Sequence, residues 1–338
     1  MSNVDQLESQ QSLPDKDLIN DLRNVDGDIM ILGIGGKMGP TLGMLAVNAF
    51  KEIGTDQKVY GTSRFSNESL RKKLESFGIH TLAGDLMDEA FLDSLPACKN
   101  VIYMAGNKFG TSGNEHFTWA MNSYLPGRVA EQFKHSNIVA FSSGNVYPFM
   151  PNNSKGAKET TKPDPIGEYA QSCLGRERLF EHFAIKNQTP TLIYRLNYAV
   201  DLRYGVLYDI AKAIYEDVPI DITTSYVNVI WQGDANSYAL RSLLHCTSPA
   251  TFLNITGPEK ISVKWVAEEL GQRMKKPVNF IGQPEEKSLL NDASRAFQFF
   301  GKPKVGLTQL LDWTADWIMS GGEGLGKPTH FQERKGNF

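Results

Sequence analysis

Short apolar runs separated by longer stretches of mixed polarity make up most of the first 195 residues of the chain. We expect strands over Ile29 to Leu32, Lys58 to Thr62, His80 to Leu82, Asn100 to Met104, Ile138 to Phe141 and Thr191 to Arg195. Helices are expected up to about Ile53, over Ser69 to Phe77, Asp88 to Leu95 and Gly167 to Phe183, and through Trp119 to about Phe133. Strand and helix therefore alternate, which predicts an α/β protein with a doubly wound parallel sheet.

The first expected strand meets a glycine cluster without a gap, in the segment DIMILGIGGKMG from Asp28 to Gly39. Gly33, Gly36 and Gly39 follow one another at steps of three residues, and an expected helix comes next. Glycines permit a tight turn and a close approach of the backbone to a pyrophosphate, and the N–H groups of a helix N-terminus attract that anion. Strand, glycine turn and helix together predict a Rossmann-type dinucleotide site rather than an ordinary turn.

The rest of the chain continues the alternation less regularly, with helices expected over Gly205 to Ile214, Val263 to Met274 and Gln309 to Met319. We divide the chain into an N-terminal extension (1–27), an NAD(P)-binding Rossmann domain (28–195), a smaller C-terminal substrate lobe interleaved with it (196–320) and a tail (321–338). We expect the first part of the extension to be mobile and Asp17 to Val25 to form a short helix. The glycine-rich tail is either disordered or a strap over the surface or over a partner subunit.

The residues that end the expected strands fall at one edge of such a sheet, because its strands are parallel. They include Ser63, Arg64, Asp85, Ala105, Gly106, Lys108 and Ser143. Ligands of doubly wound sheets bind in the crevice at this carboxyl edge. We therefore expect these residues to converge on one site.

Composition and charge exclude several classes of protein. The net charge of −3 gives no indication of a nucleic-acid partner, and no uncharged apolar stretch is long enough to span a bilayer. The three cysteines are widely spaced and the six histidines show no ligand spacing, so no metal site is expected. The N-terminus is polar and acidic, unlike a signal peptide. We expect a cytoplasmic protein that takes a small-molecule substrate, with a homodimer left open.

Several short motifs follow one another along the chain and support a family resemblance. They are Gly33-x-x-Gly36-x-x-Gly39, Gly84-Asp85-Leu86, MAGNK ending at Lys108, FSSGNVY around Ser143 and PxxxYxxS around Tyr169. In this order and spacing they resemble the extended short-chain dehydrogenase/reductase superfamily, the NAD-dependent epimerase/dehydratase family of which UDP-galactose 4-epimerase is a member. The resemblance covers roughly Asp28 to Ile318.

The resemblance implies roles for individual residues. Ser143 would hydrogen-bond the substrate oxygen, Tyr169 would give or take its proton, and Asn122 would hold its helix or a proton-relay water. The cofactor-binding residues that it implies are Gly33, Gly36, Lys37, Met38, Gly39, Ser63, Arg64, Asp85, Leu86, Ala105, Gly106, Lys108, Tyr169 and Leu196.

The end of the second strand bears on which dinucleotide is bound. An NAD site usually has an Asp or Glu there that binds the ribose 2′-hydroxyl, whereas an NADP site has a cation for the 2′-phosphate. This chain has no acid there, and Thr62, Ser63 and Arg64 offer two hydroxyls and a guanidinium. These groups suit a phosphate dianion. We therefore expect NADP as the cofactor, with NAD possible because arginine also tolerates it.

Position 173 departs from the family pattern, because Cys173 stands where the family has a lysine four residues after the tyrosine. On a helix that spacing puts both side chains on one face, and the lysine binds the nicotinamide ribose and lowers the tyrosine pKa. Without it the pKa of Tyr169 is expected near its unperturbed value of about 10. Three interpretations remain open. Lys108 substitutes as the cation, Tyr169 acts only as a neutral hydrogen-bond donor, or the protein binds cofactor without turnover.

A second departure concerns the substrate. Where nucleotide-sugar members of the family carry an arginine that clamps the diphosphate, this chain has Val227. The loss of a charge-assisted clamp favours a smaller, less charged substrate. We therefore expect an NADP(H)-dependent oxidoreductase, biased toward reduction, that acts on a carbonyl or hydroxyl of a small metabolite. The alternatives are a sugar epimerase or dehydratase with retained NAD(P), and a non-catalytic NADP-binding redox-sensing regulator.

Overall fold

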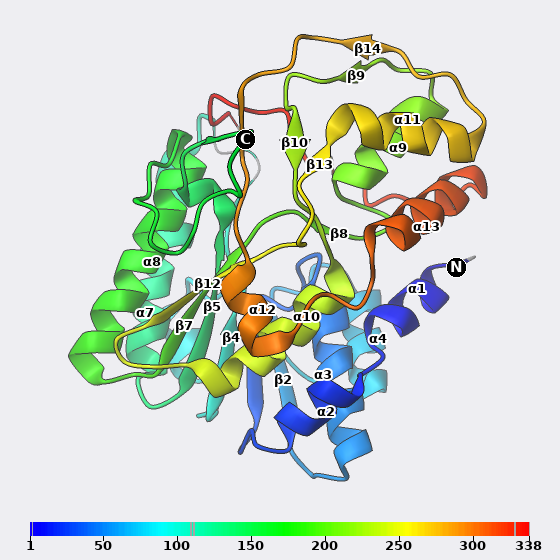
Figure 1. The fold of residues 1–338 in the computed structure, drawn as a ribbon. Coiled ribbons are helices and arrows are strands. Elements are labelled where there is room, and N and C mark those ends of the chain that lie inside the picture. The colour runs from blue at the N-terminus through cyan, green and yellow to red at the C-terminus, as the bar shows by residue number, and fades with distance from the viewer. Residues whose placement is uncertain (2, 109, 111, 328, 338) are drawn as a thin grey trace.

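A computed structural model describes residues 1, 3–108, 110, 112–327 and 329–337 of the chain. Its centre is a seven-stranded sheet in the order β12-β7-β5-β4-β1-β2-β3, with every neighbouring pair parallel (Figure 1). The strands are β1 (Ile29–Leu32), β2 (Val59–Ser63), β3 (His80–Ala83), β4 (Asn100–Tyr103), β5 (Asn137–Ser143), β7 (Thr191–Leu196) and β12 (Thr251–Ile255). The expected doubly wound α/β fold is confirmed, and β12 extends the sheet by a strand that we did not expect.

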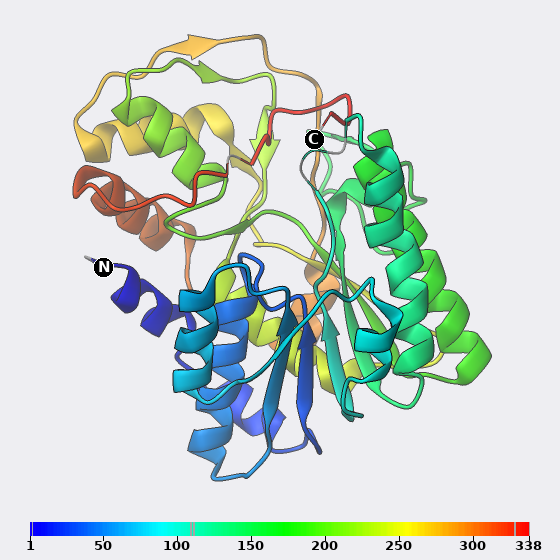
Figure 2. The ribbon, with the colours of Figure 1, turned by 180° about the vertical axis from the view of Figure 1, so that it is seen from behind.

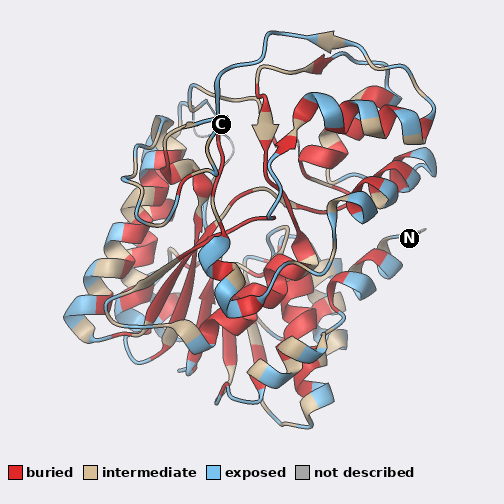
Figure 3. Cartoon of the chain, in the orientation of Figure 1, coloured by how far each residue is buried: buried red, intermediate tan, exposed pale blue. Residues whose placement is uncertain are grey.

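Both faces of the sheet are covered, which explains why its strands read as continuous apolar runs. All four residues of β1 are buried, with Ile29 and Ile31 in the core of one face and Met30 and Leu32 in the core of the other. Figure 3 shows the central strands almost entirely in the colour of buried residues. The first face packs against α3 (Gly39–Ile53), α4 (Glu68–Phe77), α10 (Gln232–Arg241) and α12 (Ser294–Phe300).

The opposite face packs against α5 (Glu89–Asp93), α7 (Leu125–Gln132) and α8 (Gly167–Asn187). A π-helical turn, Ala120–Tyr124, joins α7 to the preceding α6 (Glu115–Trp119). The long helix expected through Trp119 is therefore present but carries one wide turn, a feature that occurs frequently at functional sites.

A second group of helices lies beyond the carboxyl edge of the sheet (Figure 1). It consists of α9 (Val206–Tyr215), α11 (Val263–Met274) and α13 (Leu307–Met319), which share a separate buried core. The remaining strands form four short pairs. These are β8 (Ala199–Val200) with β11 (Ile230–Trp231), β9 (Ile220–Asp221) with β14 (Phe280–Ile281), β10 (Tyr226–Val227) with β13 (Ile261–Ser262), and β6 (Met150–Pro151) with β15 (Lys287–Ser288). Within the part of the chain that the structure describes, no helix has both the length and the apolar character needed to cross a membrane.

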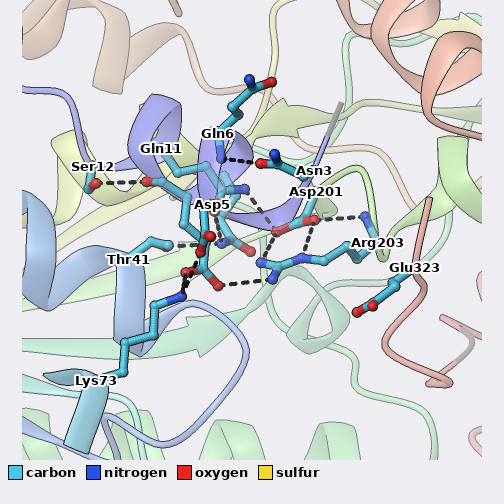
Figure 4. A network of polar contacts seen from close by, with 12 residues as sticks. Asn3, Asp5, Gln6, Gln11, Ser12, Thr41, Lys73, Asp201, Arg203 and Glu323 are labelled. Atoms are coloured by element: carbon cyan, nitrogen blue, oxygen red, sulfur yellow. Dashed lines mark hydrogen bonds and ion pairs between the residues drawn. The ribbon is translucent and has the colours of Figure 1, made fainter. Parts of the chain in front are cut away.

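The first part of the N-terminal extension is helical, not mobile as we expected. It forms α1 (Val4–Gln11), followed by α2 (Lys16–Leu22). Leu7 of α1 is fully buried in the core of the second helix group, and Gln11 donates to Asp201 at 2.8 Å (Figure 4). Glu8 accepts hydrogen bonds from both Arg203 and Lys73. The expectation was wrong because these partners lie far along the chain, 190 residues away for Asp201.

Candidate active site

The three spaced glycines of the turn after β1 are required for different reasons. Gly33 has a φ of +92°, and a Cβ there would lie 2.8 Å from the backbone nitrogen of Ala105. A Cβ at Gly39 would collide with the carbonyl oxygen of Ile34. At Gly36, by contrast, a Cβ would meet only the Gly33 carbonyl oxygen among the described residues, at 3.4 Å. The fold itself requires the first and third glycines, whereas the open space at Gly36 faces a cavity and suits the close approach of a phosphate.

That cavity has a volume of about 710 Å³ and lies at the carboxyl edge of the sheet. This volume is ordinary for a cofactor site. At its glycine-turn end, α3 begins without a side-chain cap among the described residues, so its N-terminal N–H groups remain for a ligand. The predicted residues that line it are Gly33, Gly36, Lys37, Met38, Gly106, Lys108, Ser143, Tyr169 and Leu196. The uncapped helix and the room at Gly36 fit the pyrophosphate of a dinucleotide.

The other predicted cofactor residues lie outside this lining. They are Gly39, Ala105, Ser63, Arg64, Asp85 and Leu86. Ser63 ends β2, Arg64 follows it, and Asp85 and Leu86 follow β3 at the same edge of the sheet, where a Rossmann site receives the adenosine half of the cofactor. Arg64 is exposed, and Asp85 accepts a hydrogen bond from the backbone nitrogen of Met87 at 2.9 Å. Their contacts with a cofactor stay predictions.

The two hydroxyls expected to act on a substrate are brought together. Ser143 ends β5, Tyr169 lies in the first turn of α8, and both line the cavity, where the Ser143 hydroxyl is close enough to lower the pKa of Tyr169. The Ser143 hydroxyl also accepts from the backbone nitrogen of Asn145 at 3.2 Å, which orients it. The Cys173 thiol, one helical turn further on, lies close enough to the Tyr169 hydroxyl to raise its pKa.

Burial raises the pKa of Tyr169 well above its ordinary value of 10.0. The neighbouring Cys173 thiol raises it further, while the Arg176 guanidinium and the Ser143 hydroxyl oppose the shift. Our expectation of a pKa near 10 is therefore corrected upward, because the sequence did not reveal how the half-buried Tyr169 is surrounded by other parts of the protein. At neutral pH the Tyr169 hydroxyl is a proton donor and not a base.

Cys173 is itself fully buried, and burial raises the pKa of its thiol. A thiol in that state is a poor nucleophile. The side chain therefore fills space beside Tyr169 and does not replace the positive charge of the family's lysine.

Lys108 brings a positive charge close to Tyr169, with its ammonium 5.8 Å from the centre of the phenol ring. Burial lowers the pKa of Lys108 to about 8, and the nearby Cys173 and Asp209 oppose this shift. The geometry thus favours the interpretation in which Lys108 takes over part of the missing lysine's role.

A second lysine, Lys37 of the glycine turn, lies with its ammonium 3.2 Å from the centre of the Tyr204 ring. Burial lowers the pKa of Lys37 to about 7, and the charges of Lys108 and Lys327 contribute to the decrease. Positive charges that lie close together and lower one another's pKa are typical of a site that binds an anion.

Asn122, in the π-helical turn, is fully buried and holds two parts of the site together. Its side-chain oxygen accepts from the Asn107 backbone nitrogen at 2.8 Å and from Arg176 at 2.7 Å. Its side-chain nitrogen donates to the Asn107 carbonyl at 2.7 Å and to Ser172 Oγ at 3.0 Å. All four hydrogen-bonding positions of the amide are used, so the geometry favours the holding role over the binding of a relay water.

Arg176 is a site residue that our sequence analysis missed. It is 6% exposed, lines the cavity, and donates to the Phe141 carbonyl at 2.9 Å as well as to Asn122. Its Nε has no hydrogen-bond partner among the described residues. The signal was its spacing, three residues after Cys173 and seven after Tyr169, which places all three on one helix face. Arg176 thus supplies a buried positive charge near the position where the family's lysine is missing.

Comparison with protein-family models and with curated protein sequences finds no significant match. Solved structures do match. UDP-glucuronic acid 4-epimerase from Bacillus cereus, solved with a fluorinated UDP-glucuronic acid and NAD, is 19% identical, with a TM-score of 0.71 over 86% of this chain and 98% of that one. UDP-glucose 4-epimerase from Thermotoga maritima, solved with UDP-glucose, is 17% identical, with a TM-score of 0.70 over 86% and 98%. Pal from Bacillus thuringiensis is 16% identical, with a TM-score of 0.71 over 87% and 99%.

The likeness to these structures is one of fold, and it extends over nearly the whole length of each. It confirms the Rossmann-type architecture, and with it the expected resemblance to the fold of NAD-dependent UDP-sugar epimerases. The substrate and the choice of cofactor depend on the residues of this chain.

Proposed function

We propose that this chain is a nicotinamide-dinucleotide-dependent oxidoreductase that interconverts a carbonyl and a hydroxyl group of a small metabolite, with reduction as the favoured direction. The observation that carries the proposal is the Ser143–Tyr169 hydroxyl pair in the wall of the cavity that begins at the glycine turn. When bound, the cofactor supplies or accepts the hydride. The residues of the chain have the remaining tasks of positioning the substrate and moving one proton.

In reduction, the Ser143 hydroxyl holds the carbonyl oxygen and the Tyr169 hydroxyl gives its proton to that oxygen as the alcohol forms. The raised pKa of Tyr169 keeps this proton in place at neutral pH. The phenolate that remains is stabilised by the positive charges of Arg176 and Lys108 until it is protonated again. Oxidation needs the phenolate as its starting base, and the same raised pKa makes that form scarce, which supports the bias toward reduction.

NADP is the cofactor that we propose, with NAD as the alternative. The end of β2 carries no carboxylate for a ribose hydroxyl, and Arg64 there is exposed and accessible to a 2′-phosphate. The similar epimerase from Bacillus cereus was solved with NAD, so likeness of fold does not decide the choice.

The proposal is tested by incubating the purified chain with NADPH and a panel of small carbonyl compounds, and following the oxidation of the cofactor. We expect turnover of at least one compound, and its loss in Tyr169→Phe with the affinity for NADPH retained. A chain that binds NADPH tightly but oxidises it with no compound in the panel would favour the non-catalytic regulator. Full activity in Tyr169→Phe would show that the proton comes from another group.

A UDP-sugar epimerase with retained cofactor is a second candidate, favoured by the fold likeness. Against it, Val227 is fully buried at the position where nucleotide-sugar enzymes of this family carry an arginine, so it offers no charge to a diphosphate. Mass analysis of the purified chain distinguishes the two. Co-purified NAD together with interconversion of added UDP-hexoses would support the epimerase, and release of free NADP would support the oxidoreductase.

A further inference from the structure

The tail after α13 runs across the mouth of the cavity. Figure 2 shows it in red, leading from the end of α13 along the second helix group toward the beginning of α8. Thr329 donates twice to the Asp209 carboxylate of α9, from its backbone nitrogen at 2.8 Å and its hydroxyl at 2.6 Å. Phe331 is buried in the core of that helix group, and its carbonyl accepts from Thr224 at 3.2 Å. Of the two interpretations of the tail, the strap over the chain's own surface describes it.

The C-terminal end of the tail packs against the sheet domain. Gly336 packs directly on Gly167 at the start of α8, where a Cβ on Gly336 would lie 2.5 Å from the Gly167 Cα. Both glycines have positive φ, +82° and +80°, so this close backbone contact depends on glycine at both positions. Two residues before Gly336, the Arg334 guanidinium lies 4.2 Å from the centre of the Phe149 ring. The tail therefore bridges the second helix group and the sheet domain.

A small pocket, which we call the chamber, lies between the tail and the sheet domain. Its volume is about 30 Å³, enough for one or two water molecules or one small polar group. Lys108 and Asn145 line it from the sheet side, and His330 and Arg334 line it from the tail. Lys108 and Asn145 also line the larger cavity that holds the Ser143–Tyr169 pair, so the chamber adjoins the proposed reaction site.

The lining of this chamber carries two basic side chains, Lys108 and Arg334, and one acidic side chain, Glu333. Arg334 Nη1 is buried without a hydrogen-bond partner among the described residues, and burial lowers the pKa of Lys108 to about 8. One oxygen of the Glu333 carboxylate accepts from the backbone nitrogen of Lys335 at 2.5 Å, and this carboxylate can balance only one of the two positive charges. A buried guanidinium nitrogen without a partner is costly unless an anion completes it.

We propose that residues 322–327 and 329–337 form a strap that closes over the substrate, and that Arg334 on the strap and Lys108 opposite it bind an oxyanion group of that substrate, a carboxylate or a phosphate. The inference rests on the proposed function in that it places this group next to the reacting carbonyl. Because the chamber is small and the end of the strap forms part of its lining, we expect the substrate to enter when this end leaves Gly167.

The first experiment measures anion binding by calorimetry on the full chain saturated with NADPH, using malonate and inorganic phosphate as separate probes. Saturation keeps the probes away from the pyrophosphate site at the glycine turn. We expect at least one probe to bind, and Arg334→Gln to weaken it about tenfold or more, since a hydrogen bond to a charged group is lost. The control is Arg178→Gln, at an exposed arginine of α8 that is paired with Glu181. The probe that binds more tightly identifies carboxylate or phosphate as the group.

The second experiment unseats the strap without changing a charge. In Gly336→Val the new side chain would collide with Gly167, whereas Gly306→Val is a matched control because a Cβ at Gly306 meets no described atom within 4 Å. We expect Gly336→Val to speed tryptic cleavage after Arg334 and Lys335 severalfold and to weaken the probe, with NADPH affinity unchanged. In the unaltered chain, the bound probe should slow this cleavage.

Failure of either proposal can be recognised separately. Strap-dependent binding of malonate or phosphate in a chain that reduces no carbonyl compound would leave the strap site standing and overturn the proposed function. Equal probe affinity in Arg334→Gln and the unaltered chain, no binding of either probe, or no effect of Gly336→Val would overturn the strap site, whatever the catalytic result.

Discussion

Two buried arginines, Arg176 and Arg195, differ in whether they form hydrogen bonds with the Glu177 carboxylate. Arg195 of β7 binds the Glu177 carboxylate with two hydrogen bonds, of 2.9 and 2.7 Å, and both side chains are almost completely buried. Arg176, which precedes Glu177 in α8, is just as buried, but among the described residues it donates to a carbonyl and an amide oxygen and to no carboxylate. One charge is neutralised within the fold, and the other is left facing the cavity.

The difference separates a structural charge from a functional one. A buried ion pair whose partners satisfy each other joins β7 to α8 and has nothing left for a ligand. A buried guanidinium without a counter-ion costs free energy in the empty protein, and that cost is recovered only when negative charge develops nearby. The phenolate that Tyr169 leaves after giving up its proton is such a charge. Lys37 and Lys108 resemble Arg176, because burial makes their positive charges costly in the empty protein and so lowers the pKa of each lysine.

The largest effect is expected on stability, from Glu177→Gln. It leaves Arg195 buried without a counter-charge and should lower the free energy of unfolding by about 3–5 kcal/mol. Arg176→Met removes two hydrogen bonds but breaks no ion pair, and it should lower this free energy by less than Glu177→Gln does. Urea unfolding of both variants checks the contrast. If Arg176→Met were as destabilising as Glu177→Gln, Arg176 would be a structural residue like Arg195.

The next effect is expected on catalysis. Tyr169→Phe removes the proton donor and should slow reduction by about two to four orders of magnitude, with stability and NADPH affinity retained. Tyr194→Phe is the matched control, because the Tyr194 hydroxyl is buried and donates to the Ala235 carbonyl at 2.6 Å, outside the cavity. It should reduce stability and leave the turnover of the folded enzyme unchanged. Steady-state kinetics and thermal unfolding of the two variants separate these outcomes.

A third arginine, Arg64, extends the comparison to an exposed position. If it pairs with a 2′-phosphate, Arg64→Ala should weaken NADPH by about 2 kcal/mol and leave NADH nearly unchanged. Calorimetric titration with both cofactors measures this difference. An equal loss for both cofactors would show that Arg64 does not distinguish between them.

The smallest effect is expected from pH. Because the pKa of Lys37 falls from 10.5 to about 7 on folding, the unfolded chain binds more protons than the folded chain between these values. The free energy of unfolding of the cofactor-free chain should therefore rise with pH above about 7, by about 1 kcal/mol or less between pH 7 and 8. Lys37→Met should flatten this rise. Lys99→Met, at an exposed lysine paired with Asp26, should not.

Much of the fold and part of the site could be predicted from the sequence. β1 to β5 and β7 were expected nearly within their observed bounds. For β1 the reason is that a strand buried on both faces must be apolar along its whole length, whereas the edge strand β3 is exposed at both ends and was expected from the alternation of strands and helices. Gly36 and Ser143 were placed at one edge of the sheet, because parallel strands bring their carboxyl ends together. The strand β12 and the helix α1 were missed, since their short segments take their structure from packing against distant parts of the chain.

The sequence by itself determined the doubly wound sheet, the glycine turn and the residue types at the strand ends, because these follow from local periodicity and from which residues tolerate a tight turn. Only the tertiary structure decided the environment of each charge. The spacing of Cys173 and Arg176 is visible in the sequence. The hydrogen-bond partners of Arg176, the surroundings of Tyr169 and the shared pocket of Arg334 and Lys108 are not. Desolvation and charge pairing depend on every atom that folding brings within a few ångströms, and most of those atoms come from segments far apart in the chain.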